Sequence, residues 1–226
     1  MSRKELKKGA KTKLNGHFSF FFLLFLPYIV LYFIGSSQSN SQGLKTLQNQ
    51  QTGLNWGSIL LLLASLILVG AQFVSLDSIR NKVEYTQGFS KGFTIFSNSK
   101  YFWGAVGIGL LEFIWVFLWT LLLFVPGIIK GLAYSQAFYI YRDSVDAGQP
   151  LRFRDAVTQS RQMMDGHKWE FFVLQLSLIG WQILVWITNG LAGIWVFPYT
   201  NLTYANYYDH LKEEQAGNIV EPATEN

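Results

Sequence analysis

Six long apolar stretches, separated by short polar segments, dominate the hydropathy pattern of this chain. A helix of about 20 apolar residues is long enough to cross the hydrocarbon core of a bilayer, and somewhat shorter stretches remain candidates. The pattern therefore predicts an all-α fold, a polytopic membrane helix bundle whose six transmembrane helices form three hairpins. The six stretches are residues 18–34, 56–74, 101–125, 127–141, 169–187 and 191–208.

The third and fourth stretches follow one another without a polar loop. As a single helix, residues 101–141 would be roughly 60 Å long, about twice the thickness of the hydrocarbon core. Pro126 lacks a backbone donor and Gly127 tolerates a chain reversal, so the sequence predicts a tight turn at Val125-Pro126-Gly127. Asn189-Gly190 predicts the corresponding turn between the fifth and sixth stretches.

The fourth stretch is the weakest of the six, because it contains Lys130, Ser135 and Gln136. Hydropathy alone leaves open whether it crosses the membrane or lies at the interface. The charge distribution favours a crossing: with six crossings and the N-terminus inside, all 18 lysines and arginines except Lys45 and Lys130 fall on the inner side. This asymmetry is what the positive-inside rule expects. The chain is thus predicted to be multi-pass, with both termini cytoplasmic.

The chain also contains a unit that occurs three times, each time as an amphipathic basic segment followed by two apolar stretches. Repetition of this kind indicates architecture rather than activity. The predicted units are residues 2–76, 77–143 and 150–212, within a single membrane domain at 1–212. The acidic segment 213–226 is predicted to be a disordered tail.

Each amphipathic segment ends at a small polar corner, where the chain is expected to turn into the membrane. In the first unit the apolar positions are Leu6, Ala10 and Leu14, which share one helical face. We expect each unit to begin with a basic amphipathic interfacial helix whose apolar face lies among the lipid headgroups. The second and third units match at an offset of 66 residues, for example Asp143 with Asp209. The three corners are Asn15-Gly16-His17, Asn98-Ser99-Lys100 and Asp165-Gly166-His167.

Composition agrees with a membrane protein and excludes several other classes. Hydrophobic residues make up 50% of the chain and charged residues only 14%, whereas a soluble domain carries about 25% charged residues. Cysteine is absent, which excludes disulfides and zinc–thiolate sites. The net charge of +4 lies beside the apolar stretches rather than in a groove with interleaved aromatics, so no nucleic-acid partner is expected.

Glu112 is the sharpest candidate for a functional residue inside the membrane, because a carboxylate in the middle of an apolar helix is costly. One reading is a site for a proton, a cation or a lipid headgroup. The other is a protonated or hydrogen-bonded glutamate that locks helices together, with Gln136, Tyr139 or Gln175 as its partner. Both readings remain open from sequence.

A second set of candidates lies at the predicted membrane surfaces. His17 and His167 occupy equivalent corners, where a helix-entry or headgroup role is favoured over a metal or acid–base pair. Lys130, one turn beyond Pro126, either holds an anionic group or extends to the interface. The third corner carries a charged group that binds headgroups or a partner, or is simply solvated. That group is Arg161, Asp165 and Lys168.

Several short motifs together carry a family resemblance: Arg3-Lys4-Glu5-Leu6-Lys7, Val125-Pro126-Gly127-Ile128-Ile129-Lys130 with Tyr134-Ser135, Ser160-Arg161 with Met164-Asp165-Gly166-His167-Lys168, and Phe197-Pro198-Tyr199 with Tyr204. With them the chain resembles the bacterial integral-membrane family known as domain of unknown function 975. The resemblance implies a multi-helix protein of a bacterial plasma membrane with no established activity. It supplies no catalytic residue.

Three functions follow, in decreasing order of support. The first is a non-catalytic membrane organiser or accessory protein that interacts with lipids of the anionic inner leaflet, with a partner protein or with its own copies. The second is a small transporter or carrier of lipid or ions with Glu112 in its interior. The third is an intramembrane lipid-modifying enzyme using His17, Asp165 and His167. No catalytic residue, metal ligand or cofactor is assigned.

Overall fold

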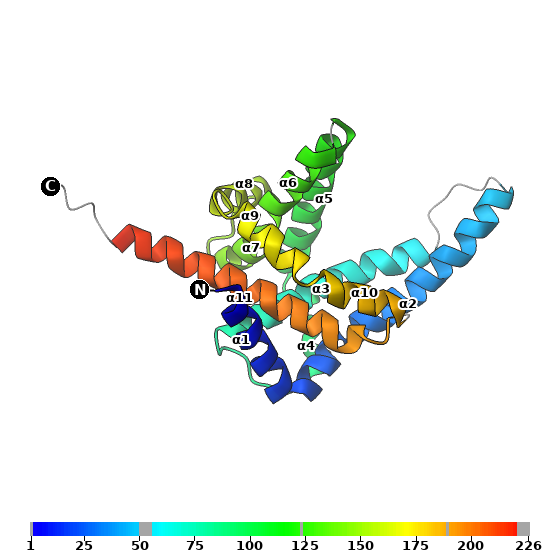
Figure 1. Ribbon diagram of the computed structural model, residues 1–226, viewed down its shortest axis with the longest axis horizontal. Helices are drawn as coiled ribbons and strands as arrows, with labels where there is room; N and C mark the ends of the chain where they lie inside the picture. The colour runs from blue at the N-terminus through cyan, green and yellow to red at the C-terminus, as the bar shows by residue number, and fades with distance from the viewer. Residues whose placement is uncertain (1, 50–55, 123, 189, 221–226) are drawn as a thin grey trace.

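The computed structural model describes residues 2–49, 56–122, 124–188 and 190–220 (Figure 1). All regular structure in these ranges is helical, which confirms the all-α fold class. The elements are α1 Arg3–Gly16, α2 Phe18–Asn49, α3 Trp56–Ile79, α4 Gly88–Lys91, the 3-10 helix η1 Thr94–Phe96, α5 Ser99–Leu122, α6 Phe124–Tyr134, α7 Ala137–Asp146, α8 Phe153–Met163, α9 Lys168–Leu176, α10 Ile179–Ile187 and α11 Gly193–Val220.

Within the described residues, four helical segments are long and apolar enough to cross a membrane: Phe18–Gln38, Trp56–Ile79, Ser99–Leu121 and Lys168–Ile187. The predicted fourth stretch is divided between α6 and α7, and the sixth forms the first half of α11. The protein is therefore all-helical and contains four segments of the kind that span membranes. Six crossings remain a prediction.

The helices pack in two groups (Figure 1). Helix α2 packs along α3, and α11 crosses both while also contacting α1. Helix α5 packs along α6, and this pair stands apart from α2 and α3 in Figure 1. One apolar core lies among α5, α7, α8, α9 and α11, and a second lies among α1, α2, α3 and α11. Helix α11 therefore contributes to both cores.

The turn predicted at Val125-Pro126-Gly127 is placed differently by the structure. Helix α5 ends at Leu122 and α6 already begins at Phe124, so Pro126 lies in the first turn of α6. A proline is tolerated there because the first backbone N–H groups of a helix have no intrahelical partner. Gly127 serves close packing instead, because a Cβ atom at this position would lie 2.2 Å from Oγ1 of Thr120 on α5.

The second predicted turn is confirmed at Gly190, whose φ of +94° is a left-handed conformation that glycine adopts without strain. Its N–H donates to the carbonyl of Val185 at the end of α10 (2.8 Å). Asn189, the other residue of this predicted turn, lies outside the described residues.

The amphipathic segments differ from their predicted role. Leu6, Ala10 and Leu14 of α1 are 0% exposed, so this apolar face is buried inside the protein and not among lipid headgroups. Helix α8 likewise buries its apolar face, including Ala156 and Val157. In the second unit the apolar face of the amphipathic segment consists of Phe89, Phe93 and Phe96, which lie on or between α4 and η1 and are 37% to 51% exposed. The apolar faces of the first and third amphipathic segments are therefore buried by tertiary packing.

Two helices also extend beyond their predicted ends. Helix α2 continues to Asn49, past the apolar stretch that ends at residue 34. Helix α11 continues to Val220, although residues 213–226 were predicted to be disordered. The sequence Lys-Glu-Glu-Gln-Ala at 212–216 consists of strong helix formers, which explains the extension. The remaining residues 221–226 lie outside the described part.

Candidate functional site: a charged cluster and a broken helix

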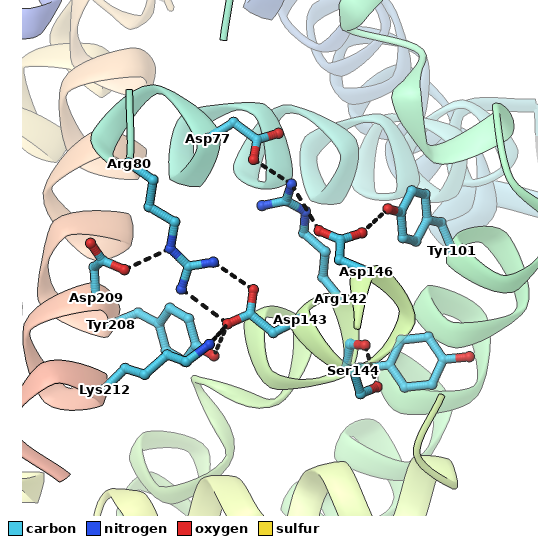
Figure 2. Close-up of polar contacts among 11 residues, drawn as sticks. Asp77, Arg80, Tyr101, Arg142, Asp143, Ser144, Asp146, Tyr208, Asp209 and Lys212 are labelled. Atoms are coloured by element: carbon cyan, nitrogen blue, oxygen red, sulfur yellow. Dashed lines mark hydrogen bonds and ion pairs between the residues drawn. The ribbon is translucent and has the colours of Figure 1, made fainter. Parts of the chain in front are cut away.

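The densest polar contact network in the structure joins the ends of α3 and α7 to the middle of α11 (Figure 2). Arg80, directly after α3, reaches two carboxylates. Its Nη1 and Nη2 donate to both oxygens of Asp143 on α7 (2.6 and 3.0 Å), and its Nε donates to Asp209 on α11 (2.7 Å). The fork-shaped contact with Asp143 is the strongest geometry for an arginine–carboxylate pair. One guanidinium thus ties three helices together.

Asp143 accepts two further hydrogen bonds, from the hydroxyl of Tyr208 (2.9 Å) and from the ammonium of Lys212. Its side chain is only 13% exposed. Burial alone would raise the pKa of this carboxyl group, but the hydrogen bonds from Arg80 and Lys212 outweigh burial and hold the pKa at about 2. Asp143 is therefore fully ionised at neutral pH.

A second arginine extends the network toward α5. Nη2 of Arg142 donates to Asp77 of α3 (2.5 Å) and lies 3.3 Å from a carboxylate oxygen of Asp146. Asp146 also accepts a hydrogen bond from the hydroxyl of Tyr101, near the start of α5. These contacts bring the first turn of α5 beside the last turn of α7. We call the whole set the aspartate–arginine cluster: Asp77, Arg80, Tyr101, Arg142, Asp143, Asp146, Tyr208, Asp209 and Lys212 (Figure 2).

The aspartate–arginine cluster connects its helices through ion pairs and hydrogen bonds. Each of its carboxylates is engaged by a cation or a hydroxyl group. Within the described ranges, no group of three or more histidine, aspartate or glutamate side chains is placed to hold a metal ion. Removing one member of such a network leaves a buried charge without its partner, which is strongly destabilising. The cluster therefore fixes these helices relative to one another.

Sequence reasoning paired Asp143 with Asp209 but missed Asp77 and Arg80. The signal was present, because Asp77 precedes Asp143 by the same 66 residues that separate Asp143 from Asp209. Each aspartate is followed two positions later by an aliphatic residue and three positions later by a charged residue, namely Arg80, Asp146 and Lys212. Extending the offset backward from Asp143 would have identified all three helices that meet in the cluster.

Glu112 lies on α5 opposite a break between two helices. Helix α6 ends at Tyr134 and α7 begins at Ala137. Oε1 of Glu112 and Oε1 of Gln136, a residue of the break, are both buried without a hydrogen-bond partner. Gln175, the third residue of the predicted interior site, lies at the end of α9 and is partly exposed. The hydrogen bonds of the described residues therefore do not join Glu112 to Gln136, Tyr139 or Gln175.

The break itself is stabilised from α8. The backbone N–H of Gln136 donates to Oγ of Ser160 (3.1 Å), and that hydroxyl donates to the carbonyl of Ala133 (2.9 Å). Ser160 is 0% exposed and thus replaces, inside the protein, part of the helical hydrogen bonding that the break removes. The break between α6 and α7 is accordingly stabilised by specific hydrogen bonds to Ser160.

The two corner histidines have different neighbours. The ring of His17 stacks on Tyr85 with a centroid distance of 3.4 Å and an interplanar angle of 4°. His167 lies near Glu170 (3.7 Å), and its carbonyl accepts a hydrogen bond from Tyr207 (3.3 Å). The contacts of the described chain therefore do not join them as a metal-binding or acid–base pair.

The remaining surface candidates are paired locally. The ammonium of Lys130 lies over the ring of Trp119 on α5, 4.7 Å from its centroid. Lys168 pairs with Asp165 at 2.8 Å at the exposed third corner. Arg161, one turn earlier on α8, is exposed. Exposed pairs of this kind contribute little to stability and leave the surface free to contact other molecules.

A protein-family model described as "Protein of unknown function (DUF975)" matches residues 111–215. The resemblance inferred from the motifs is thereby confirmed. Searches of curated proteins and of solved structures found no match. The DUF975 match begins within α5 and ends within α11, so it contains Glu112, the α6–α7 break and the α7 and α11 members of the cluster.

The DUF975 match leaves out α1, α2 and α3. Asp77, Arg80 and Tyr101 of the cluster therefore lie outside the matched residues. The family description names no activity. What these side chains do must therefore be inferred from their contacts in this structure.

Proposed function

We propose that this protein is a multi-pass membrane protein of a bacterial plasma membrane that organises anionic lipids or a partner at the cytoplasmic face, without catalytic chemistry of its own. The observation that supports the proposal is that residues before and after each pair of apolar segments contact one another.

Contacts support three hairpins and six crossings. His17 before α2 stacks on Tyr85 after α3. Tyr101 at the start of α5 bonds Asp146 at the end of α7. The carbonyl of His167, directly before α9, accepts from Tyr207 in the second half of α11. If the outgoing helix of each pair crosses the bilayer, the returning helix crosses as well.

The aspartate–arginine cluster supports placing all three sets of ends on the same side. Arg80 follows the second helix of the first hairpin, and its partners Asp143 and Asp209 belong to the other two hairpins. The positive-inside rule identifies this side as cytoplasmic, because the segments around the cluster carry most of the lysines and arginines. Both termini then also lie in the cytoplasm.

Helix α1 presents a basic surface that is held rigidly. A capping box between Ser2 and Glu5 closes its N-terminus. Asn206 of α11 donates to the carbonyl of Leu6 (3.1 Å), and Lys13 donates to the carbonyl of Ser78 (2.9 Å). The apolar face of α1 is buried, and its opposite face exposes four basic side chains to the surroundings. The exposed basic residues are Arg3, Lys4, Lys8 and Lys11.

A groove of about 630 Å³ runs between α1 and the segment after α3. Lys8, Lys13 and His17 line it together with Tyr85. Cationic side chains beside an aromatic ring suit a lipid phosphate, and each lysine near an anionic leaflet contributes about 1 kcal/mol. We assign this groove to an anionic lipid headgroup at the inner leaflet. Arg161, Asp165, His167 and Lys168 form a second surface for headgroups or a partner.

The test is native mass spectrometry of the protein in nanodiscs that contain phosphatidylglycerol and phosphatidylcholine. Lys8→Gln with Lys13→Gln removes two charges that line the groove, about 2 kcal/mol in total, so retention of phosphatidylglycerol should fall roughly 10- to 30-fold. Arg152→Gln with Arg154→Gln removes the same charge at the start of α8 and serves as the control. Equal loss in both double variants, or no loss in either, would contradict the assignment.

A transporter or carrier is the second candidate, and the specific observation that favours it is the unpartnered buried oxygen of Glu112 beside a broken helix. Unchanged stability of Glu112→Gln together with lost ion or lipid flux in proteoliposomes would favour transport over organisation.

A further inference from the structure

The register of α5 against α6 and α7 places Glu112 at the level of the helix break. Three close approaches define this register: Thr120 with Gly127, Gly109 with Phe138, and Gly104 with Tyr141. The residue numbers of the facing positions therefore change in opposite directions and at nearly the same rate, as antiparallel helices require. Residue 112 then lies opposite residues 134 and 135, where α6 ends.

Hydrogen bonding within the break leaves one buried side-chain oxygen atom without a donor. The side-chain amide nitrogen of Gln136 donates to Oγ of Ser135 (2.8 Å), and this hydroxyl donates to the carbonyl of Leu132 (2.8 Å). The side-chain donors of Ser135 and Gln136 therefore form hydrogen bonds to neighbouring residues of the break. Oε1 of Gln136 has no hydrogen-bond partner, although the residue is only 1% exposed.

Glu112 provides a second acceptor in the same region. Its Oε1 is buried without a hydrogen-bond partner, and none of the ion pairs found among the described residues involves it. The C-terminal end of α6 adds the negative pole of a helix dipole. Buried polar atoms in folded proteins are almost always satisfied, so two unpartnered oxygens beside a helix terminus require an explanation.

We propose that Glu112, Gln136 and the C-terminal end of α6 form a binding site for a single positive charge, either a proton or an alkali-metal cation. An acceptor-only group of oxygens suits such a ligand and offers nothing to an anion. Broken membrane helices with a nearby carboxylate are a recurring way to build sites of this kind. The site is independent of the lipid groove at α1, which lies on other helices.

Infrared spectroscopy of the protein in nanodiscs tests the site directly, because a protonated carboxyl group has its own C=O stretching band. The band that disappears in Glu112→Gln is assigned to Glu112. Its pH midpoint is then measured in choline buffer and again with sodium or potassium. For a cation site, each tenfold increase in a competing cation at saturation lowers the midpoint by about one pH unit. For a proton site, the band titrates and the cations leave the midpoint unchanged.

Two further variants keep the test decisive if Glu112→Gln does not fold. Gln136→Met removes the second oxygen and should reduce the cation effect or move the midpoint, whereas Gln175→Met, on α9, should leave both unchanged. A Glu112 band that stays constant over the whole pH range in which the protein remains folded, with or without cations, overturns the proposal and makes Glu112 a structural lock. Equal effects of Gln136→Met and Gln175→Met overturn it as well. Lipid retention in these variants should match the wild type, so failure here is distinguishable from failure of the proposed function.

Discussion

Helices α3 and α5 are both 24 residues long and both apolar enough to cross a membrane, yet they differ in how much of their surface other helices cover. In the most apolar window, 50% of the residues of α3 are buried inside the protein, compared with 17% for α5. Helix α3 is enclosed by α2 and α11, whereas α5 has α6 as its main neighbour along its second half. Two apolar helices of equal length therefore become a half-enclosed helix in one region and a largely exposed helix in the other.

Small residues explain much of this difference. In α3 they occur along the whole helix, and at Gly70 an added Cβ atom would lie 3.0 Å from the backbone nitrogen of Ile95. In α5 they are confined to the first half, between Gly104 and Gly109, while the second half carries exposed bulky residues such as Phe113 and Phe117. Small residues let helices approach closely, which bulky aromatic residues prevent.

The largest expected effect concerns the anchors at the ends of the two helices. Arg80→Met removes the anchor at the end of α3 and leaves Asp143 and Asp209 without that partner, so we expect a loss of about 3–5 kcal/mol of stability. Tyr101→Phe removes a single hydrogen bond near the start of α5 and should cost about 1 kcal/mol. Denaturant unfolding in mixed micelles measures both. Equal losses would show that the two ends are anchored alike.

A matched isoleucine pair sharpens the comparison of the helix faces. Ile67 on α3 is 3% exposed and Ile114 on α5 is 42% exposed. Ile67→Ala should cost about 2–5 kcal/mol because it leaves a cavity, while Ile114→Ala should cost less than about 1 kcal/mol. The same unfolding assay applies. A large loss at Ile114 would indicate that protein, and not lipid, covers this face of α5.

A glycine pair tests the packed half of α5 against its neighbouring helix. A Cβ atom at Gly104 would lie 1.8 Å from the ring of Tyr141, which is held by a hydrogen bond to the carbonyl of Lys100 (3.2 Å). Gly104→Ala should therefore destabilise the protein by about 1–3 kcal/mol. Gly131 on α6 has open space around it, so Gly131→Ala should be neutral or stabilise by up to about 1 kcal/mol. Thermal unfolding in nanodiscs compares the two.

Acid should weaken the aspartate–arginine cluster at the end of α3 while sparing the contacts of α5 with α6. The pKa of Asp143 is about 2 in the folded protein, against an ordinary value of 3.8. Because the folded pKa is the lower one, ionised Asp143 stabilises the fold above about pH 4, and this contribution is lost as the pH falls toward 2. The loss amounts to about 2 kcal/mol.

The unfolding temperature measured across this pH range checks the prediction. Asp143→Asn should lower stability at neutral pH and flatten the acid-induced change. Asp155→Asn, at an exposed position in the first turn of α8, is the control and should keep the wild-type acid response. An unaltered acid response in Asp143→Asn would assign the effect to other carboxylates.

Part of this structure could be predicted from the sequence because hydropathy acts over long stretches. The all-helical class and four apolar helical segments follow directly from apolar runs. The α6–α7 break was not predictable, because Ser135-Gln136 contains neither glycine nor proline and depends on Ser160 of a distant helix. The burial of α1 was missed for a similar reason: an amphipathic face packs equally well on lipid or on protein, and only the tertiary contacts with α11 decide.

The candidate site was predictable in part. Glu112 and Gln136 stood out as polar residues in apolar stretches, and the register places them at the same level. Arg80 and Asp77 lie just beyond or at the end of an apolar run, where charged residues are ordinary, so only the 66-residue spacing could have distinguished them. Asp143, paired by that spacing with Asp209, was the nearest clue.

Cysteine accessibility shows whether the two ends of every hairpin lie together on the cytoplasmic side, and the chain has no cysteine of its own that would interfere. Arg154→Cys on α8 is informative, since this segment lies outside if α6 and α7 fail to cross. Lys8→Cys marks the side of the N-terminus. A membrane-impermeant thiol reagent should label both positions only in opened cells or inverted vesicles. Labelling of Arg154→Cys in intact cells would contradict six crossings and the cytoplasmic cluster.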